Sequence, residues 1–228
     1  MPVRSYRWLL LTLALTGFAV DQASKYGVFR WLYNGGEPAA GSWFRYEPPL
    51  GCNVFVLIPG AFRLTAQFTG VEPPASGLRP LQTWSGPTMP YVNKGALFGQ
   101  RVTDWLGLGP NYKWVDNLFF SAVSLLAAVG ILVWGTRPAV ARDRWLTTAL
   151  GLILAGTLGN MYDRMVFDGV RDFFDFHLIN WPVFNVADCC LVVGAGLLLL
   201  QAVFVPAEPA EPAEKPAAVT AGSGGPVS

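Results

Sequence analysis

The sequence predicts an all-α membrane protein, a bundle of four transmembrane helices with a small extracytoplasmic β-rich lobe between the first and second helices. Hydrophobic residues make up 52% of the 228 residues. Charged residues make up only 14%, against about 25% in soluble domains. The few charged residues border four long apolar runs. Together these observations exclude an ordinary water-soluble globule.

The first apolar run, residues 8–20, is short for a membrane span, and with Arg4 and Arg7 before it the run could belong to a signal peptide. No clean small-residue cleavage site follows the run, and helix-compatible sequence continues beyond Asp21. We therefore expect a retained helix at about residues 5–28.

Three further charge-free runs approach the roughly 20 residues that a helix needs to cross a bilayer. They predict helices at about residues 117–136, 144–163 and 186–206. Arginines mark the cytoplasmic helix ends, because short cytoplasmic loops are enriched in Lys and Arg. These are Arg4 and Arg7 before the first helix, and Arg137, Arg142 and Arg144 between the second and third. Both chain ends are thus expected in the cytoplasm.

The lobe, at about residues 32–116, is expected outside the membrane. Within it, residues 53–58 form a β-type apolar run, Pro59 and Gly60 favour a turn, and residues 62–68 alternate between apolar and polar. This pattern predicts a hairpin whose apolar face rests on the membrane surface or on the helix ends. We expect residues 1–205 to form one membrane-embedded domain. The Pro-, Ala- and Glu-rich residues 206–228 are expected to be a disordered cytoplasmic tail.

The composition also limits the kinds of partner and cofactor that the protein is expected to bind. The net charge is +1, which favours no nucleic-acid partner. With one histidine and three cysteines, the chain is poorly supplied for zinc, haem or a disulfide scaffold. No serine-hydrolase elbow, zinc-protease helix or phosphate-binding loop occurs in the sequence. We therefore expect neither a metal nor another cofactor.

Polar and charged residues gather at the predicted outer face of the bundle. They are Asp21, Lys25, Asn160, Asp163, Arg164, Asp172, Asp175, His177, Asn185 and Asp188. A charged side chain near the centre of a bilayer costs about 2.5–3.5 kcal/mol on insertion scales, so such a cluster indicates a functional site.

Some of these residues are better suited to support than to catalysis. Lys25 follows Asp21 at i+4, where the two side chains can pair. Asp163 is expected at a helix C-terminus, which disfavours an anion, so it needs a donor such as Arg164 or a backbone amide.

Asp172 and Asp188 are different, because a short excursion between two helices can bring them to the same place. Two neighbouring carboxylates near hydrocarbon cannot both ionise easily, so one holds a proton while the other activates water. The alternative is that Asp188 caps the last helix and that Asp172 and Asp175 are solvated loop residues. Spacing alone does not decide between them.

Two alternative functions fit the sequence less well. A transporter or channel could use the outer aspartates as an ion path, but the second and fourth helices are almost wholly apolar between their ends. A presenilin-type protease requires a Gly-x-Gly-Asp motif, and none is present.

Six motifs in order give the chain a specific resemblance. They are DQASK at 21–25, IPGAFRLT at 58–65, NKGALFG at 93–99, GNMYDR at 159–164, VRDF at 170–173 and FNVAD at 184–188. In these motifs the chain resembles lipoprotein signal peptidase, the bacterial signal peptidase II family of aspartyl membrane proteases. The resemblance implies removal of the signal peptide from diacylglyceryl-modified prolipoproteins, just before the lipidated cysteine. It places the site at the outer face of the inner membrane, with membrane lipid as a partner. We expect a monomer.

By the same resemblance, the catalytic pair is Asp172 and Asp188. The residues implied to position substrate or hold the site are Asn93, Asn160, Asp163, Arg164 and Asn185, with Asp21 and Lys25 in support.

Two features depart from the family pattern. Arg171 stands where the family has an apolar residue. In an extended segment its side chain would point away from Asp172, and otherwise it would lower the pKa of Asp172. The outer loop also carries extra sequence at about residues 33–52 and 70–90.

Overall fold

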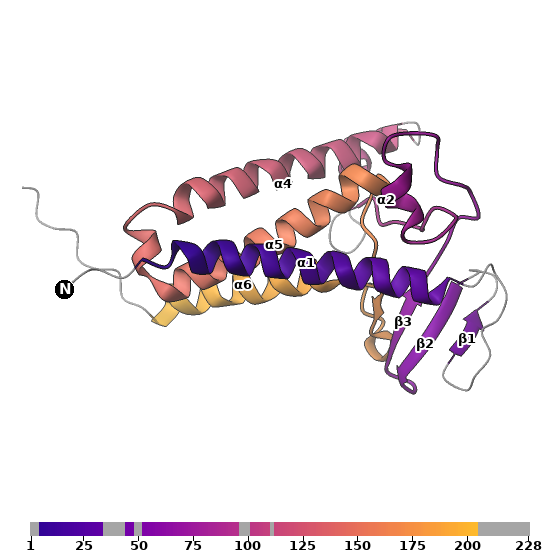
Figure 1. Ribbon diagram of the computed structural model, residues 1–228, viewed down its shortest axis with the longest axis horizontal. Helices are drawn as coiled ribbons and strands as arrows, with labels where there is room; N and C mark the ends of the chain where they lie inside the picture. The colour runs from indigo at the N-terminus through magenta and orange to yellow at the C-terminus, as the bar shows by residue number, and fades with distance from the viewer. Residues whose placement is uncertain (1–4, 34–43, 48–51, 96–100, 110–111, 205–228) are drawn as a thin grey trace, which may run out of the picture.

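The computed structural model describes residues 5–33, 44–47, 52–95, 101–109 and 112–204. Four long helices dominate it and lie side by side (Figure 1). They are α1 (Arg7–Leu32), α4 (Lys113–Gly135), α5 (Arg144–Phe167) and α6 (Val186–Phe204). α1 and α5 run in one direction, and α4 and α6 run in the other (Figure 1). The four predicted helices are present. The predicted tail at 206–228 and part of the extra loop at 33–52 lie outside the described residues.

The helices extend further toward the lobe than the sequence predicts. α1 continues past the predicted end near residue 28 to Leu32. α5 continues past residue 163 to Phe167, and α4 begins at Lys113 rather than at 117. Asp163 ends the predicted third helix but pairs with Arg171 inside the protein, and Asp116 precedes the predicted second helix but accepts from Thr103. Both therefore lie within helices and do not terminate them.

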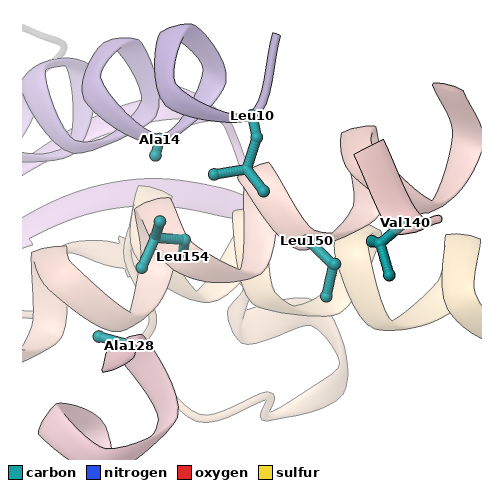
Figure 2. Close-up of a cluster of buried hydrophobic side chains, with 6 residues drawn as sticks. All are labelled: Leu10, Ala14, Ala128, Val140, Leu150 and Leu154. Carbon is teal, nitrogen blue, oxygen red and sulfur yellow. The ribbon is translucent and has the colours of Figure 1, made fainter. Parts of the chain in front are cut away.

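α5 lies at the centre of the bundle, where it packs against α1, α4 and α6. Away from the lobe, the core consists of small and aliphatic side chains (Figure 2). They are Leu10, Ala14, Ala128, Val140, Leu150 and Leu154. Nearer the lobe, α6 approaches Gly156 so closely that a Cβ atom there would lie 2.3 Å from the carbonyl oxygen of Ala187. Only glycine fits this contact.

Two of the described helices are long and apolar enough to cross a membrane, α4 over Trp114–Gly135 and α6 over Val186–Phe204. Only 11% of each apolar stretch is buried inside the protein, so most of its surface is available to lipid. α1 and α5 carry charged residues in the halves nearer the lobe, which lowers their hydropathy. That α1 and α5 also span the bilayer stays a prediction.

A four-stranded antiparallel sheet forms the lobe, in the order β1-β2-β3-β4. The strands are β1 (Phe44–Glu47), β2 (Cys52–Ile58), β3 (Phe62–Ala66) and β4 (Phe174–Asp175). β2 and β3 are the predicted hairpin, and Gly60 in their turn has a φ of 75°. β4 was not predicted, because it comes from the segment between α5 and α6 that is expected to be a loop. Two short helices, α2 (Arg79–Thr83) and α3 (Val102–Trp105), complete the described part of the lobe.

The lobe rests on the end of α1. Phe29 and Leu32 of α1 pack against Ala66 of β3 and against Phe173, which precedes β4. The prediction that the hairpin packs on the helix ends is therefore confirmed. Since Phe173 follows Asp172 directly, this packing also positions the segment that carries the first of the two aspartates.

We predict that Gly156→Leu destabilises the protein, because the new side chain would collide with the main chain of α6 at Ala187 and with Leu191. Overpacking of this kind costs about 1–3 kcal/mol. Thermal unfolding in detergent should show a lower midpoint for the variant. Gly130→Leu is the matched control, because a Cβ atom at Gly130 meets nothing within 4 Å. Equal midpoints for the two variants would contradict the assignment of this contact.

Candidate active site

Asp172 lies in a short extended segment that is held on both sides by main-chain hydrogen bonds. Val170 and Asn93 exchange two of them, each 2.8 Å long. The amide of Phe173 donates to the carbonyl of Phe184 at 3.1 Å, and its carbonyl accepts from the amide of Thr65 at 2.9 Å. These bonds fix the main chain on either side of Asp172.

Asp188 lies in the first turn of α6 and forms a reciprocal cap with Asn185. The side-chain oxygen of Asn185 accepts from the amide of Asp188 at 3.1 Å, and Asp188 Oδ2 accepts from the amide of Asn185 at 3.2 Å. This is the geometry of a capping box, in which Asn185 is the N-cap. The alternative that Asp188 is the N-cap is therefore wrong, although its carboxylate does take part in the cap.

Asn185 connects the two aspartates. Its Nδ2 donates to Asp172 Oδ1 at 2.7 Å, while its main-chain amide contacts Asp188. Two further asparagines each donate to one carboxylate. Asn93 Nδ2 lies 3.2 Å from Asp172 Oδ2, and Asn160 Nδ2 lies 2.8 Å from Asp188 Oδ1. The three asparagines singled out in the sequence are thus brought to the aspartates.

Asp172 is partly accessible from a cavity but is densely surrounded by protein. This burial, together with the neighbouring charge of Asp188, raises the pKa of Asp172 to about 7. Hydrogen bonds from Asn185 and Asn93 act in the opposite direction but do not cancel the effect. Asp172 can therefore hold a proton near neutral pH, as two adjacent carboxylates require.

A buried ion cluster lies behind the asparagines. The predicted i+4 pair is present, with Lys25 Nζ 2.9 Å from Asp21 Oδ2 and both side chains fully buried. Asp21 Oδ1 accepts from the amide of Ala187 at 2.8 Å, so α1 satisfies a free donor in the first turn of α6. Gly159 makes room for this carboxylate, because a Cβ atom there would lie 2.5 Å from Asp21 Oδ2.

Asp163 obtains its donors from Arg171 and not from Arg164. The Arg171 guanidinium contacts both Asp163 oxygens, at 2.8 and 3.1 Å, and its main-chain amide donates at 2.9 Å. Of the two kinds of donor expected, the backbone amide is therefore confirmed, whereas the Arg164 side chain donates to the carbonyl of Gly95 at 3.1 Å. Arg171 itself points away from Asp172, as an extended segment predicts.

Both aspartates line one cavity of about 500 Å³. Its polar lining also includes Asn93, Asn160 and Arg164. Its apolar lining comes largely from α4 and α6 and includes Phe120, Val123, Ala127, Leu191, Val192 and Ala195. A second cavity of about 280 Å³ shares Asn93 and Asp172 and is bordered by Thr65 and Gln67 of the lobe. Asp172 therefore borders both an apolar space between helices and a more polar space beneath the lobe.

Two residues of the predicted outer cluster do not join the site. Asp175 lies in β4 and pairs with Arg63 at 2.5 Å, and His177 begins a short 3₁₀ turn. Neither lines the two cavities just described. Across the described part of the chain, no three His, Cys, Asp or Glu side chains come together as a metal site would require.

Sequence reasoning missed two members of the ion cluster. Gln22 donates to Asp21 and Asp163, and Ser85 accepts from Arg171. Gln22 lies beside Asp21 in the chain, but nothing in the sequence signals that Ser85 reaches the helices. Arg171 carried a signal, since it departs from the family pattern, but its partner Asp163 was not predicted.

Known proteins are similar to this chain in sequence and in fold. The family model for signal peptidase (SPase) II matches residues 88–204. A lipoprotein signal peptidase of Rhodopirellula baltica is 33% identical over 214 residues, covering 88% of this chain and 73% of that protein. One of Yersinia enterocolitica is 41% identical over 92 residues, covering 40% of this chain and 54% of that protein. Two solved bacterial membrane enzymes have the same fold, with TM-scores of 0.59 and 0.58 at 20% and 19% identity, covering 89% and 90% of this chain and 92% and 99% of theirs.

The family match defines a protease of the aspartyl class. The chain belongs to the signal peptidase II family, the lipoprotein signal peptidases. Family membership confirms the resemblance found in the sequence motifs. It favours the peptidase over the alternative of a transporter or channel.

The raised pKa of Asp172 predicts a pH dependence of stability. Because the native state binds this proton more tightly than the unfolded chain, the contribution is complete below pH 3.8 and is lost as pH rises through about 7. The slope is at most about 1.4 kcal/mol per pH unit. We expect the melting midpoint of the wild type, relative to that of Asp172→Asn, to fall between pH 4.5 and 8 in detergent. A constant difference across this range would contradict the shift.

Proposed function

We propose that Asp172 and Asp188 are the catalytic pair with which this enzyme removes the signal peptide from diacylglyceryl-modified prolipoproteins, just before the lipidated cysteine. One observation carries the proposal. Both carboxylates contact Asn185 and line the same cavity, whose other wall is apolar. Family membership supports the substrate class.

In the proposed mechanism, Asp172 holds the shared proton and Asp188 is the base. Asp188 takes a proton from a water molecule as the water oxygen attacks the scissile carbonyl carbon, and Asp172 protonates the carbonyl oxygen. The carbon–nitrogen bond then breaks. Asp188 gives its proton to the leaving amine, and the proton on the former carbonyl oxygen returns to Asp172. The products are the free signal peptide acid and the amine of the lipidated cysteine.

The polar residues around the pair have separate tasks in this mechanism. Asn93, Asn160 and Asn185 fix the orientation of the carboxylates through the hydrogen bonds described above. Arg164 lines the cavity, and its buried Nη1 has no hydrogen-bond partner among the described residues. This donor is therefore available to a carbonyl oxygen of the substrate.

The apolar wall of the cavity supports entry of substrate from within the bilayer. It comes from α4 and α6, which are also the two helices whose surfaces are apolar and mostly unburied. A diacylglyceryl group and an apolar signal helix can approach between these helices without leaving the hydrocarbon. Membrane lipid thus surrounds the entrance, and a single chain supplies all residues of the proposed site, which supports action as a monomer.

All four long helices span the inner membrane in this proposal, and residues 1–205 act as one domain. The charges inside α1 and α5 are paired, which reduces their cost within the bilayer. Exposed tryptophans lie near both ends of the bundle, as is common at membrane interfaces. They are Trp8 and Trp145 near one end, and Trp105, Trp114 and Trp181 near the other. The arginine-rich end, where α1 begins and α6 ends, then faces the cytoplasm, and the aspartates face outward.

This topology predicts how introduced cysteines react. Ser76→Cys, in the exposed part of the lobe, should react with a membrane-impermeant maleimide in intact spheroplasts. Ala139→Cys, between α4 and α5 and also exposed, should react only after the membrane is permeabilised. Both variants are made in a background without native cysteines. Labelling of Ala139→Cys in intact spheroplasts would overturn the orientation.

For the catalytic pair, we predict that Asp172→Asn and Asp188→Asn each lower processing of a lipidated precursor by about 10²–10⁴-fold, because each removes one proton carrier. The measurement is conversion of precursor to mature lipoprotein by purified enzyme in lipid. Glu72→Gln is the control, since this carboxylate is 77% exposed and pairs with the surface residue Arg79. Full processing by either aspartate variant, at normal levels in the membrane, would sink the assignment.

A further inference from the structure

Arg171 is the largest fully buried side chain in the described protein, and its guanidinium donates four hydrogen bonds. Beyond its contacts with Asp163, Nη1 donates to Ser85 at 2.7 Å and Nη2 donates to Gln22 at 3.0 Å. The guanidinium also lies 4.2 Å from the ring centre of Tyr26 and 3.9 Å from that of Phe167. Such a site holds a cation in one fixed position.

The charges around Arg171 balance. Two cations, Arg171 and Lys25, share the buried cluster with two anions, Asp21 and Asp163. Arg171 contacts both oxygens of Asp163, whereas Lys25 lies 3.6 Å from Asp163 but only 2.9 Å from Asp21. Arg171 thus neutralises Asp163. Lys25 therefore remains available to pair with Asp21 and to donate to one further side chain.

That side chain belongs to Asn160. Lys25 Nζ donates to Asn160 Oδ1 at 3.2 Å, so the amide group of Asn160 must turn its Nδ2 toward Asp188. Asn160 Oδ1 also accepts from Asn185 Nδ2 at 3.2 Å. If Lys25 moved toward Asp163, Asn160 Oδ1 would lose its charged donor, and the Asn160 amide would be held less firmly against Asp188. Neutralisation of Asp163 by Arg171 therefore affects whether Asp188 keeps its hydrogen bond from Asn160 Nδ2.

We propose that Arg171 is a positioning residue for the catalytic pair. By neutralising Asp163, it preserves the hydrogen bond from Lys25 to Asn160. Asn160 in turn preserves its hydrogen bond to Asp188. The inference rests on the proposed function of Asp172 and Asp188. Arg171 also precedes Asp172 directly, and its amide is bonded to Asp163. One residue thus stabilises the main chain beside Asp172 and the amide that contacts Asp188.

The test is a double-variant cycle on charge. Arg171→Met leaves the cluster with one excess negative charge, and Asp163→Asn leaves it with one excess positive charge. We expect each to lower kcat by about 10–100-fold, as small misplacements of catalytic groups do. KM should change little, because neither residue lines the cavity. The doubly substituted protein is again balanced, so it should be several-fold more active than either single variant.

Two further variants separate charge from packing. Arg171→Lys keeps the charge and should retain more activity than Arg171→Met. Ser85→Ala removes one hydrogen bond to Arg171 without changing the charge and should remain close to the wild type. If Arg171→Met does not accumulate in the membrane, the comparison of the double variant with Asp163→Asn still tests the balance.

Three results would overturn the proposal. They are a double variant no more active than its better parent, equal activity of the Lys and Met variants, and an effect confined to KM. All values are read against the wild type in the processing assay. A failure of the proposed function would be recognised separately, by processing that survives Asp172→Asn and Asp188→Asn.

Discussion

The structure depends on how charge is neutralised inside a helical bundle. Two acidic and two basic side chains are fully buried where α1, α5 and the segment before β4 meet. A single unpaired charge in this position would cost several kcal/mol. Pairing removes most of that cost, and the paired groups also form hydrogen bonds to the neighbouring polar site. Asp21 reaches the first turn of α6, and Lys25 reaches Asn160, so the same groups that make burial tolerable set the position of the polar site.

The site is assembled from parts that are distant in the chain, and each part has a structural reason to be there. Asn185 begins α6 as its N-cap and contacts both aspartates as a consequence. Asn93 pairs with Val170 as one strand pairs with another, and this brings its side chain to Asp172. Helix capping and strand pairing therefore place the proposed catalytic groups, so no separate scaffold is needed to hold them.

Much of this could be predicted from the sequence. The apolar runs predicted the helices, alternation predicted the β2–β3 hairpin, and the i+4 spacing predicted the pair of Asp21 and Lys25. What could not be predicted depends on contacts between distant residues. β4 has only two residues and no period of its own, and Ser85 shows no local sign that it meets Arg171. The choice of Arg171 over Arg164 as the partner of Asp163 depends on which way each side chain leaves its backbone, and adjacency in the sequence favoured the wrong one.

The strand β4 has a consequence for how the lobe and the chemistry relate. It joins the sheet through Arg63 and Leu64 of β3 and follows Asp172 after a single residue, Phe173, which is also packed against α1. The hairpin is therefore mechanically continuous with Asp172, one of the two proposed catalytic residues. Anything that tilts the hairpin, such as a bound polypeptide or a change in the surrounding bilayer, would be transmitted to Asp172 through covalent chain and ladder bonds. Enzymes with identical cavities but different outer lobes could then differ in catalytic rate, because the lobe influences the position of the aspartate pair.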